Sequence, residues 1–321
     1  MRFNLADAQQ QALGFLVAQT AYIEPQVVTT KYPDVLYPTL IPVDTSAPEW
    51  AKSVTFYSSD QFGQADWFNH LARDIPLADV SREKFEQGIE MAAIGYFYTL
   101  EELGQAMMIR GMNLSTDRAA AARRAYEEFV DAVAFRGNTA KGLKGLINYT
   151  GVTVIDVAAD GTGTSSFWAD KTADLILRDV NDALMGVYSN SQTVEFADTL
   201  LIPLNAISAL GKIIPNSSMT VMQWLLDNNV LTMTTGQKLT IRAIRGLDDA
   251  GADGGGRIVA YRKDPTVLKL HIPMPHRFLP PVTWNGVKFD VPGIFRVGGL
   301  EIRRPGAVRY IDGITDVPYP G

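Results

Sequence analysis

The sequence predicts an α+β fold, and three features of the chain lead to that prediction. Residues 52–57 and 84–98 are typical of two strands that go out and return around a polar, aromatic excursion. Residues 116–136 are rich in alanine and carry apolar side chains at helical spacing up to Gly137, which predicts a helix roughly 30 Å long. Residues 267–314 alternate β-branched residues with proline and glycine, which indicates an almost wholly β segment.

The composition is that of a folded soluble protein with a sizeable core, in one large domain or two smaller ones. Of its 321 residues, 46% are hydrophobic and 20% are charged, and its apolar runs are too short to cross a bilayer, so no membrane is expected among its partners. The lack of cysteine excludes disulfides and cysteine-ligated metals. The net charge of −6 argues against a broad nucleic-acid-binding surface but is compatible with a container for nucleic acid.

Residues 1–50 are expected to form an N-terminal arm. Residues 7–23 have an amphipathic pattern that predicts a short helix. Residues 24–50 hold five prolines, which are expected to keep the backbone extended and to exclude both helix and central strand. The same segment is too apolar for a free tail. It is therefore expected to lie on a surface, which is either its own domain or a neighbouring copy.

The connection formed by residues 51–98 is predicted to be an arm as well. Ordering such a long excursion costs conformational entropy, which is reasonable if it lies on a neighbouring copy of the protein. Gly88 and Gly95 mark points where its returning strand can bend. Its aromatic residues are expected to anchor an interface between subunits, and they are Phe56, Tyr57, Phe62, Trp67 and Phe68. Thr99 and Glu102 then form a capping box that begins a short helix.

The helix of residues 116–136 is expected to be capped by Ser115 or Thr116. Its buried stripe is predicted to consist of Ala119, Ala122, Tyr126, Phe129, Val130 and Val133. Further strands are predicted at 152–157, 199–202, 239–244 and 257–261, and further helices at 170–188, 205–210 and 219–227, the last of them capped within 216–218. The face of the first of these helices is Ala173, Ile176, Leu177, Val180 and Leu184. Two glycine-rich loops, 160–166 and 248–256, are predicted to be flexible.

No pattern in the chain predicts a catalytic, cofactor-binding or metal-binding residue. The three histidines do not form an HExxH pair and are interpreted as structural or surface residues: His70, His271 and His276. A weak calcium site is a less favoured alternative for Asp248, Asp249 and Asp253, because they lack the spacing and closing glutamate of an EF-hand. The chain also lacks a phosphate-binding GxxxxGKS/T loop, a GxSxG elbow and a cysteine nucleophile.

Several short segments, taken with their order and spacing, carry a resemblance to a known family. They are Asp60-Gln-Phe-Gly63, Arg73-Asp-Ile-Pro76, Tyr98-Thr-Leu-Glu-Glu-Leu103, residues 119–124, residues 142–148 and residues 300–308. Together they resemble the major capsid protein of tailed bacteriophages with the Hong Kong 97-like fold, and more closely a phage and prophage capsid family long described as a domain of unknown function. The resemblance covers nearly the whole chain.

The resemblance implies a layout for the chain. Residues 1–50 are then the N-terminal arm and residues 51–98 the extended β-hairpin loop. Residues 99–148 form a peripheral domain with the spine helix, joined by strands at 266–298. Residues 149–265 form the axial domain, which packs around fivefold and sixfold axes, joined by a closing strand and C-terminus at 299–321. A covalent cross-link of the kind known in the family is not expected, because Lys52 and Lys84 are predicted to lie at the base of the loop.

The resemblance also implies a function. The chain is expected to be a coat protein, without cofactor, that assembles with itself into pentamers and hexamers of an icosahedral shell around phage double-stranded DNA, which it does not bind sequence-specifically. Scaffolding, portal and cement proteins are further partners, in a virion assembled in the host bacterial cytoplasm. Because the arm begins almost at Met1, any scaffold is expected to be a separate protein. The candidate inter-subunit contacts are the five aromatic residues of the loop together with Arg73, Tyr32, Leu36 and Tyr37.

Two alternatives stay open beside the capsid interpretation. The first is an encapsulin-like nanocompartment, a protein shell that encloses an enzyme instead of DNA. The second is a soluble α+β enzyme whose site has not been recognised. Genes for terminase and portal proteins beside this one would favour the phage shell, whereas a gene for a cargo enzyme would favour the compartment.

Overall fold

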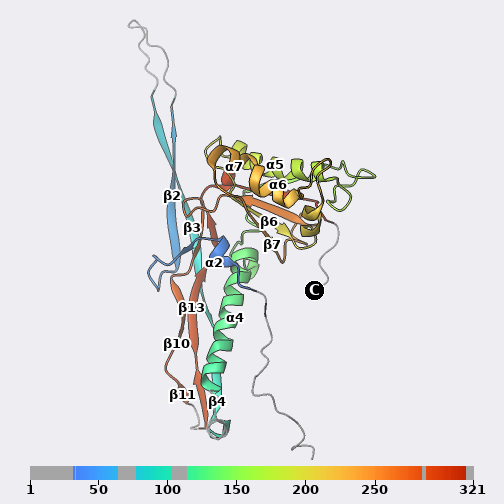
Figure 1. The fold of residues 1–321 in the computed structure, drawn as a ribbon. Coiled ribbons are helices and arrows are strands. Elements are labelled where there is room, and N and C mark those ends of the chain that lie inside the picture. Colours follow the sequence, from blue (N-terminus) through green and yellow to red (C-terminus); the bar gives the residue numbers. More distant parts are fainter. Residues whose placement is uncertain are drawn as a thin grey trace, which may run out of the picture. The chain divides into compact units, whose positions relative to one another are not determined.

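The structure, a computed structural model, describes residues 32, 34–63, 77–102, 104, 114–283 and 287–315 (Figure 1). The helices and sheets described below belong to the unit that begins at Val35. The helix predicted at residues 7–23, the excursion at 64–76 and His70 lie outside the described residues. The mixture of helices and sheets within Val35–Gly321 agrees with the predicted α+β class.

A five-stranded sheet organises the second half of the chain. Its order is β5 (Thr153–Asp156), β15 (Val308–Asp312), β8 (Arg257–Tyr261), β6 (Thr199–Pro203) and β7 (Thr240–Ile244). All strands run in one direction except β8, which is antiparallel to both of its neighbours. β6 and β7 are parallel neighbours and therefore need a crossover connection, which contains η2 (Ile207–Gly211), α6 (Val221–Asn228) and α7 (Val230–Thr235). The helix α5 (Ala173–Asn190) lies between β5 and β6 in the chain.

Both faces of this sheet are buried at its central strands, where alternate side chains enter two different cores. In β6, Leu200 and Ile202 join the core beneath the helices, whereas Leu201 joins the core on the opposite face. The predicted apolar face of α5 is confirmed, because all five of its residues are buried in the first of these cores. The period of two along the strand and of 3.6 along the helix thus place the side chains as the sequence indicates.

The long helix α4 (Leu114–Arg136) packs on the opposite side of the sheet from α5 and lies along strand β13 (Gly293–Gly298) in Figure 1. Its Tyr126 ring meets the Phe295 ring edge-on at a centroid distance of 4.7 Å. The helix ends as predicted at Gly137, where φ is +70°. Two expectations are wrong. Ser115 and Thr116 lie inside the helix instead of capping it, and Phe129 remains 40% exposed at the margin of the buried stripe.

Three smaller sheets complete the fold. One has the order β10 (Met274–Phe278), β13, β3 (Asp79–Ala93) and β2 (Ser53–Phe62), and another β11 (Val282–Thr283), β12 (Lys288–Val291) and β4 (Tyr96–Thr99). The third joins β1 (Val43–Asp44), β9 (Leu268–His271) and β14 (Leu300–Ile302). The bend in the returning strand is at Gly95, where a Cβ atom would lie 2.3 Å from the Val291 carbonyl oxygen. Gly88 instead stays in the ladder opposite Ser53.

Several predicted boundaries differ from those of the structure. The capping box is confirmed, since the Glu102 N–H donates to Thr99 Oγ1 at 3.2 Å and the Thr99 N–H to Glu102 Oε2 at 3.1 Å. The helix expected at 205–210 is the 3-10 helix η2, and α6 is capped by Thr220 instead of a residue within 216–218. The short helix α7 was not predicted. The expected closing strand is divided, because β14 pairs with β9 and only β15 enters the five-stranded sheet.

The proline-rich part of the arm also departs from the prediction. It contains a single helical turn, α2 (Tyr37–Leu40), and the two-residue strand β1. Pro38 is tolerated because it stands in the first turn of α2, where a backbone N–H has no helical partner to lose. β1 is an edge strand, which is the position in a sheet that proline-rich segments can reach.

Candidate functional site

The longest feature that no other part of the described chain covers is the ribbon of β2 and β3. Ten residue pairs, from Ser53 opposite Gly88 to Phe62 opposite Asp79, form an antiparallel ladder that is about 33 Å long. Residues 79–86 are all exposed, so the outer part of the ribbon lacks a covering layer on either face. In Figure 1 the ribbon continues past the end of β13, with which β3 pairs only from Ile89 onward. β2 is thus longer than predicted, whereas β3 has the 15 residues predicted for the returning strand but begins and ends five residues earlier.

Large apolar side chains are open to solvent on this ribbon. Tyr57 is 69% exposed, Val80 46% and Phe85 43%, and Leu77 just before β3 is 85% exposed. An isolated two-stranded ribbon is marginally stable in water, and apolar patches of this kind mark contact surfaces. The geometry therefore suits a surface that another chain covers, and it offers no concave site for a small substrate.

The structure places the predicted contact residues in different environments. Phe56 stacks on Phe85 at a centroid distance of 5.1 Å, and the Arg303 guanidinium lies 5.2 Å from the Phe56 ring, so Phe56 stabilises the ribbon itself. Tyr57 is free on the surface. Tyr32 is 49% exposed. The Phe62 side chain and the residues Trp67, Phe68 and Arg73 lie outside the described residues.

Residues 35–50 of the arm lie on the body of their own chain. The backbone N–H groups of Leu36 and Tyr37 both donate to Asp131 Oδ1 of α4 at 2.9 Å. The Tyr37 hydroxyl donates to Glu127 Oε2 at 2.8 Å, and burial followed by this hydrogen bond raises the pKa of Tyr37 well above its usual value. Tyr37 is only 6% exposed, so its side chain serves this chain's core instead of facing a neighbour. The arm was expected to lie either on its own domain or on a neighbouring copy, and residues 35–50 lie on their own domain.

A buried group of charges fastens the arm strand β1 to the body. Lys269 donates to Asp44, and His271 Nδ1 lies 3.7 Å from Asp44 Oδ2. His271 Nε2 contacts Glu301, which also accepts from Arg303. Burial tends to raise the pKa of Glu301, but the hydrogen bonds from His271 and Arg303 outweigh it and hold this pKa below its usual range.

Both described histidines have structural surroundings, as the sequence predicts. His271 is 1% exposed and part of the charge group around Asp44. His276 stacks on Tyr126 at a centroid distance of 5.2 Å, and its Nε2 lies 3.0 Å from the Ile94 carbonyl oxygen. Within the described ranges no group of three or more His, Asp or Glu side chains is arranged to hold a metal ion. Nor does any helix there have the length and apolar character needed to cross a membrane.

The two glycine-rich loops are tied down, contrary to the expectation of flexible loops. Asp248 is 4% exposed and accepts from the Asn205 N–H at 3.2 Å, and the Ala252 N–H donates to Asp312 Oδ2 at 3.0 Å. Asp160 of the other loop pairs with Lys171 at 3.1 Å. The sequence could not indicate these anchors, because each joins residues far apart in the chain.

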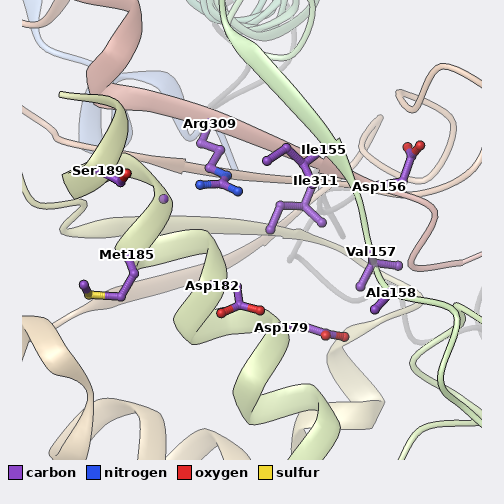
Figure 2. A pocket seen from close by; sticks show the side chains of 11 residues that line it. Ile155, Asp156, Val157, Ala158, Asp179, Asp182, Met185, Ser189, Arg309 and Ile311 are labelled. Atoms are coloured by element: carbon purple, nitrogen blue, oxygen red, sulfur yellow. The ribbon is translucent and has the colours of Figure 1, made fainter. Parts of the chain in front are cut away.

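A cleft of about 400 Å³ opens between α5 and the edge strand β5 (Figure 2). In Figure 2, Arg309 and Ile311 enter it from β15, and Asp182 and Met185 from α5. Gly186 is required here, because a Cβ atom would lie 1.3 Å from Arg309 Nη1. Burial lowers the pKa of Arg309, while Asp182 acts in the opposite direction. Sequence reasoning missed this cleft, since its walls come from segments that the chain order separates.

The chain matches one protein-family model and resembles several solved structures. Residues 63–314 match the family model described as "Major capsid protein". The chain is similar in structure to the capsid of Myoviridae phage XM1, with a TM-score of 0.76 and 20% identity over 92% of this chain and 98% of that one. It is also similar to a protein of Microbacterium phage Oxtober96, with a TM-score of 0.61 and 14% identity over 93% of this chain and 98% of that one.

A third solved structure, the capsid of the native GTA particle, has a TM-score of 0.60 and 12% identity over 94% of this chain and 97% of that one. No curated protein sequence matches the chain. At these identities the structural likeness shows the fold, which is that of phage capsid subunits, and the match to the family model carries the assignment to a family.

Proposed function

Because this chain belongs to the major capsid protein family, we propose that it assembles with copies of itself into pentamers and hexamers of an icosahedral shell that encloses phage double-stranded DNA. The role is structural and needs no catalytic residue. The observation that carries the proposal is the ribbon of β2 and β3, whose two faces and apolar side chains are open within this chain.

The ribbon supports assembly because burying its exposed apolar side chains against a partner is energetically favourable. Tyr57, Val80, Phe85 and Leu77 leave apolar area in water that a partner surface would remove, at roughly 25 cal/mol for each Å². A ribbon that leaves one subunit and lies on the next makes a heterologous contact, which closes into a ring when the rotation permits. Obligate interfaces of this kind bury about 2,000 Å² or more in total.

The layout of the family is proposed for this chain on the same ground. Residues 99–148 with the strands at 266–298 are the peripheral domain, and α4 is its spine helix. Residues 149–265 with 299–321 are the axial domain around the five-stranded sheet and α5. The arm at 1–50 and the extended loop at 51–98 join neighbouring subunits. The Leu36 side chain packs against the core of its own chain. The remaining candidate contacts, Tyr32, Tyr57, Phe62, Trp67, Phe68 and Arg73, stay assigned to these two segments.

The charge of the subunit fits a container. A formal net charge of −6 repels enclosed DNA and leaves it free to leave the particle. The proposal places the protein in the virion, after assembly in the bacterial cytoplasm, with scaffolding, portal and cement proteins as further partners. Lys84 lies opposite Tyr57, about halfway along the ribbon and not at its base as expected, so its position gives no reason to exclude a covalent cross-link.

Electron microscopy of the purified full chain tests the proposal. We expect closed shells of uniform diameter, and averaging should resolve rings of five and six subunits. Nuclease-protected DNA in particles taken from infected or induced cells would support the phage shell, whereas an enclosed enzyme would indicate a compartment. A chain that remains a small monomer at high concentration and over a range of salt would contradict the proposed function.

A further inference from the structure

The five-stranded sheet has two open edges of opposite charge. β5 and β7 stand at its two ends, and each pairs with only one strand. Beside β5, Asp156 and Asp182 are exposed, and beside β7, Lys238 and Arg242 are exposed. Asp182 attracts Arg309 electrostatically without forming an ion pair with it. Within the described part of the chain, none of these four exposed side chains forms an ion pair. Opposite charges at opposite ends are what a head-to-tail contact between copies needs.

The two edges also differ in form, with a cleft at one end and an exposed apolar side chain at the other. The cleft beside β5 is lined by Ile155, 40% exposed, and Met185, 39% exposed, by the carboxylates of Asp156 and Asp182, and by Arg309 (Figure 2). We call this surface the acidic cleft. At the other end, Met233 of α7 is 73% exposed. The Thr232 hydroxyl donates to the Gln237 carbonyl oxygen at 3.0 Å, which closes the turn between Met233 and Lys238.

We call Met233, Lys238 and Arg242 the basic edge. It presents a large, flexible apolar side chain together with two cations, whereas the acidic cleft presents apolar side chains, two exposed carboxylates and the Arg309 guanidinium. A methionine side chain adapts to an irregular apolar cavity, and the lysine and arginine can reach the rim. Within one chain these surfaces cannot meet, because three strands of the sheet lie between β5 and β7.

We propose that the acidic cleft of one subunit receives the basic edge of the next subunit around a ring. This inference rests on the proposed function and goes further, because it names the two surfaces that meet beside the ring axis. The apolar contact contributes affinity, and the four charges set orientation and register. Since the two surfaces lie at opposite ends of one sheet, the contact can repeat from subunit to subunit, and it closes into a ring when the rotation between subunits permits.

The absence of cysteine from the chain permits a direct test. Ser189 lines the acidic cleft and is exposed, and Met233 marks the basic edge. The double variant Ser189→Cys/Met233→Cys, assembled and then oxidised, is expected to give a ladder of bands up to pentamers and hexamers on a non-reducing gel. Neither single variant should give a ladder. A matched control, Ser189→Cys/Arg123→Cys, places the second thiol on the exposed side of α4 and should stay monomeric.

Charge reversal gives a second, independent test. Asp156→Lys/Asp182→Lys and Lys238→Glu/Arg242→Glu are each expected to raise the protein concentration needed for assembly about tenfold or more, since like charges then face each other. The variant that combines all four changes should recover assembly. The control Arg123→Glu/Lys144→Glu has the same charge change at other exposed positions and should not rescue the first variant. Circular dichroism of each unassembled subunit checks that it is folded.

The outcomes separate this inference from the proposed function. A ladder only from the designed cysteine pair, with rescue by the fourfold variant, supports the contact. If the wild-type chain forms shells but the designed pair gives no ladder, or if both charge reversals assemble like wild type, the inference is wrong and the shell function stands. If the wild-type chain forms no shell at all, the proposed function is wrong and this inference falls with it.

Discussion

Arg257 and Asp312 face each other across the antiparallel strands β8 and β15 and form a buried, two-pronged ion pair. Arg257 Nε donates to Asp312 Oδ1 and Arg257 Nη2 to Asp312 Oδ2, each at 2.7 Å. The remaining arm of the guanidinium donates to the Ile147 carbonyl oxygen at 2.7 Å, and its carbon lies 4.6 Å from the centre of the Tyr310 ring. The pair thus joins the end of the segment after α4 to the centre of the five-stranded sheet.

Removing one partner of this pair should lower the free energy of unfolding more than replacing both partners with apolar residues. Arg257→Met leaves the Asp312 carboxylate buried without its cation, and we expect the free energy of unfolding to fall by about 3–5 kcal/mol. Arg257→Met/Asp312→Leu should recover much of that loss, because apolar residues then replace both charges. Urea unfolding of the unassembled subunit measures the three variants. Equal losses for the single and double variants would refute the proposed coupling between the two side chains.

The glycine after α4 should be irreplaceable for a steric reason. At Gly137, φ is +70° and a Cβ atom would lie 2.4 Å from the Leu143 carbonyl oxygen, whereas Gly142 has φ of +67° and no atom within 4 Å of that position. Gly142→Ala is expected to cost about 1 kcal/mol for the left-handed backbone alone. Gly137→Ala should lower the stability several times more than Gly142→Ala does, with both variants measured by thermal unfolding. A similar loss for both variants would show that the close approach is not limiting.

Acid should weaken the attachment of the arm strand β1. Burial tends to raise the pKa of Asp44 and of Glu301, but hydrogen bonds from Lys269 and Ser46 to Asp44, and from His271 and Arg303 to Glu301, lower both. A carboxyl with a lowered folded-state pKa contributes its full stability above the unfolded pKa of about 4 and loses it as pH falls toward the folded value. We therefore expect the unfolding midpoint in urea to decrease as pH falls from about 4 toward 2.

Variants of the two carboxyls test the cause of this acid sensitivity. Asp44→Asn/Glu301→Gln should be less stable than wild type at pH 6 and should show a shallower dependence below pH 4, because neither side chain then titrates. Glu83→Gln, which removes an exposed carboxyl on the ribbon, is the control and should keep the wild-type dependence. An unchanged slope in the double variant would mean that other groups cause the acid response.

Shortening the ribbon should separate folding from assembly. Deletion of residues 61–79, with a two-residue turn in their place, should leave the thermal unfolding of the subunit nearly unchanged, since β3 pairs with the body only from Ile89 onward. The same variant should fail to form stable shells in sedimentation and electron microscopy. The milder change Tyr57→Thr keeps a residue suited to strands at a position that is 69% exposed, and it should weaken assembly alone. Normal shells from the deletion variant would contradict the role assigned to the ribbon.

Much of the local structure could be predicted from the chain alone. The 3.6-residue period predicts α4 and the buried face of α5, and short apolar runs predict the strands that became β6 and β8. Thr99 and Glu102 sit three residues apart and form the predicted capping box. These features depend on neighbours within a few residues, so a reading along the sequence can find them.

The contacts that matter most for the candidate surfaces could not be predicted in this way. The prolines near Tyr37 indicate a stiff arm, but that this arm binds Asp131 and Glu127 of α4 depends on a match between distant segments. The pairing of Arg257 with Asp312 depends on strand register, as does the position of β5 at one end of the sheet and β7 at the other.

The sequence by itself determined the elements of this protein: a ribbon, a stiff helix, and a sheet with helices between its strands. The tertiary structure alone decided which charges are buried, that residues 35–50 of the arm serve their own chain, and where the ribbon, the acidic cleft and the basic edge are left open. The physical reason is the range of the interactions. Backbone hydrogen bonding and local periodicity act between near neighbours, whereas burial and charge pairing depend on which distant segments the fold brings together.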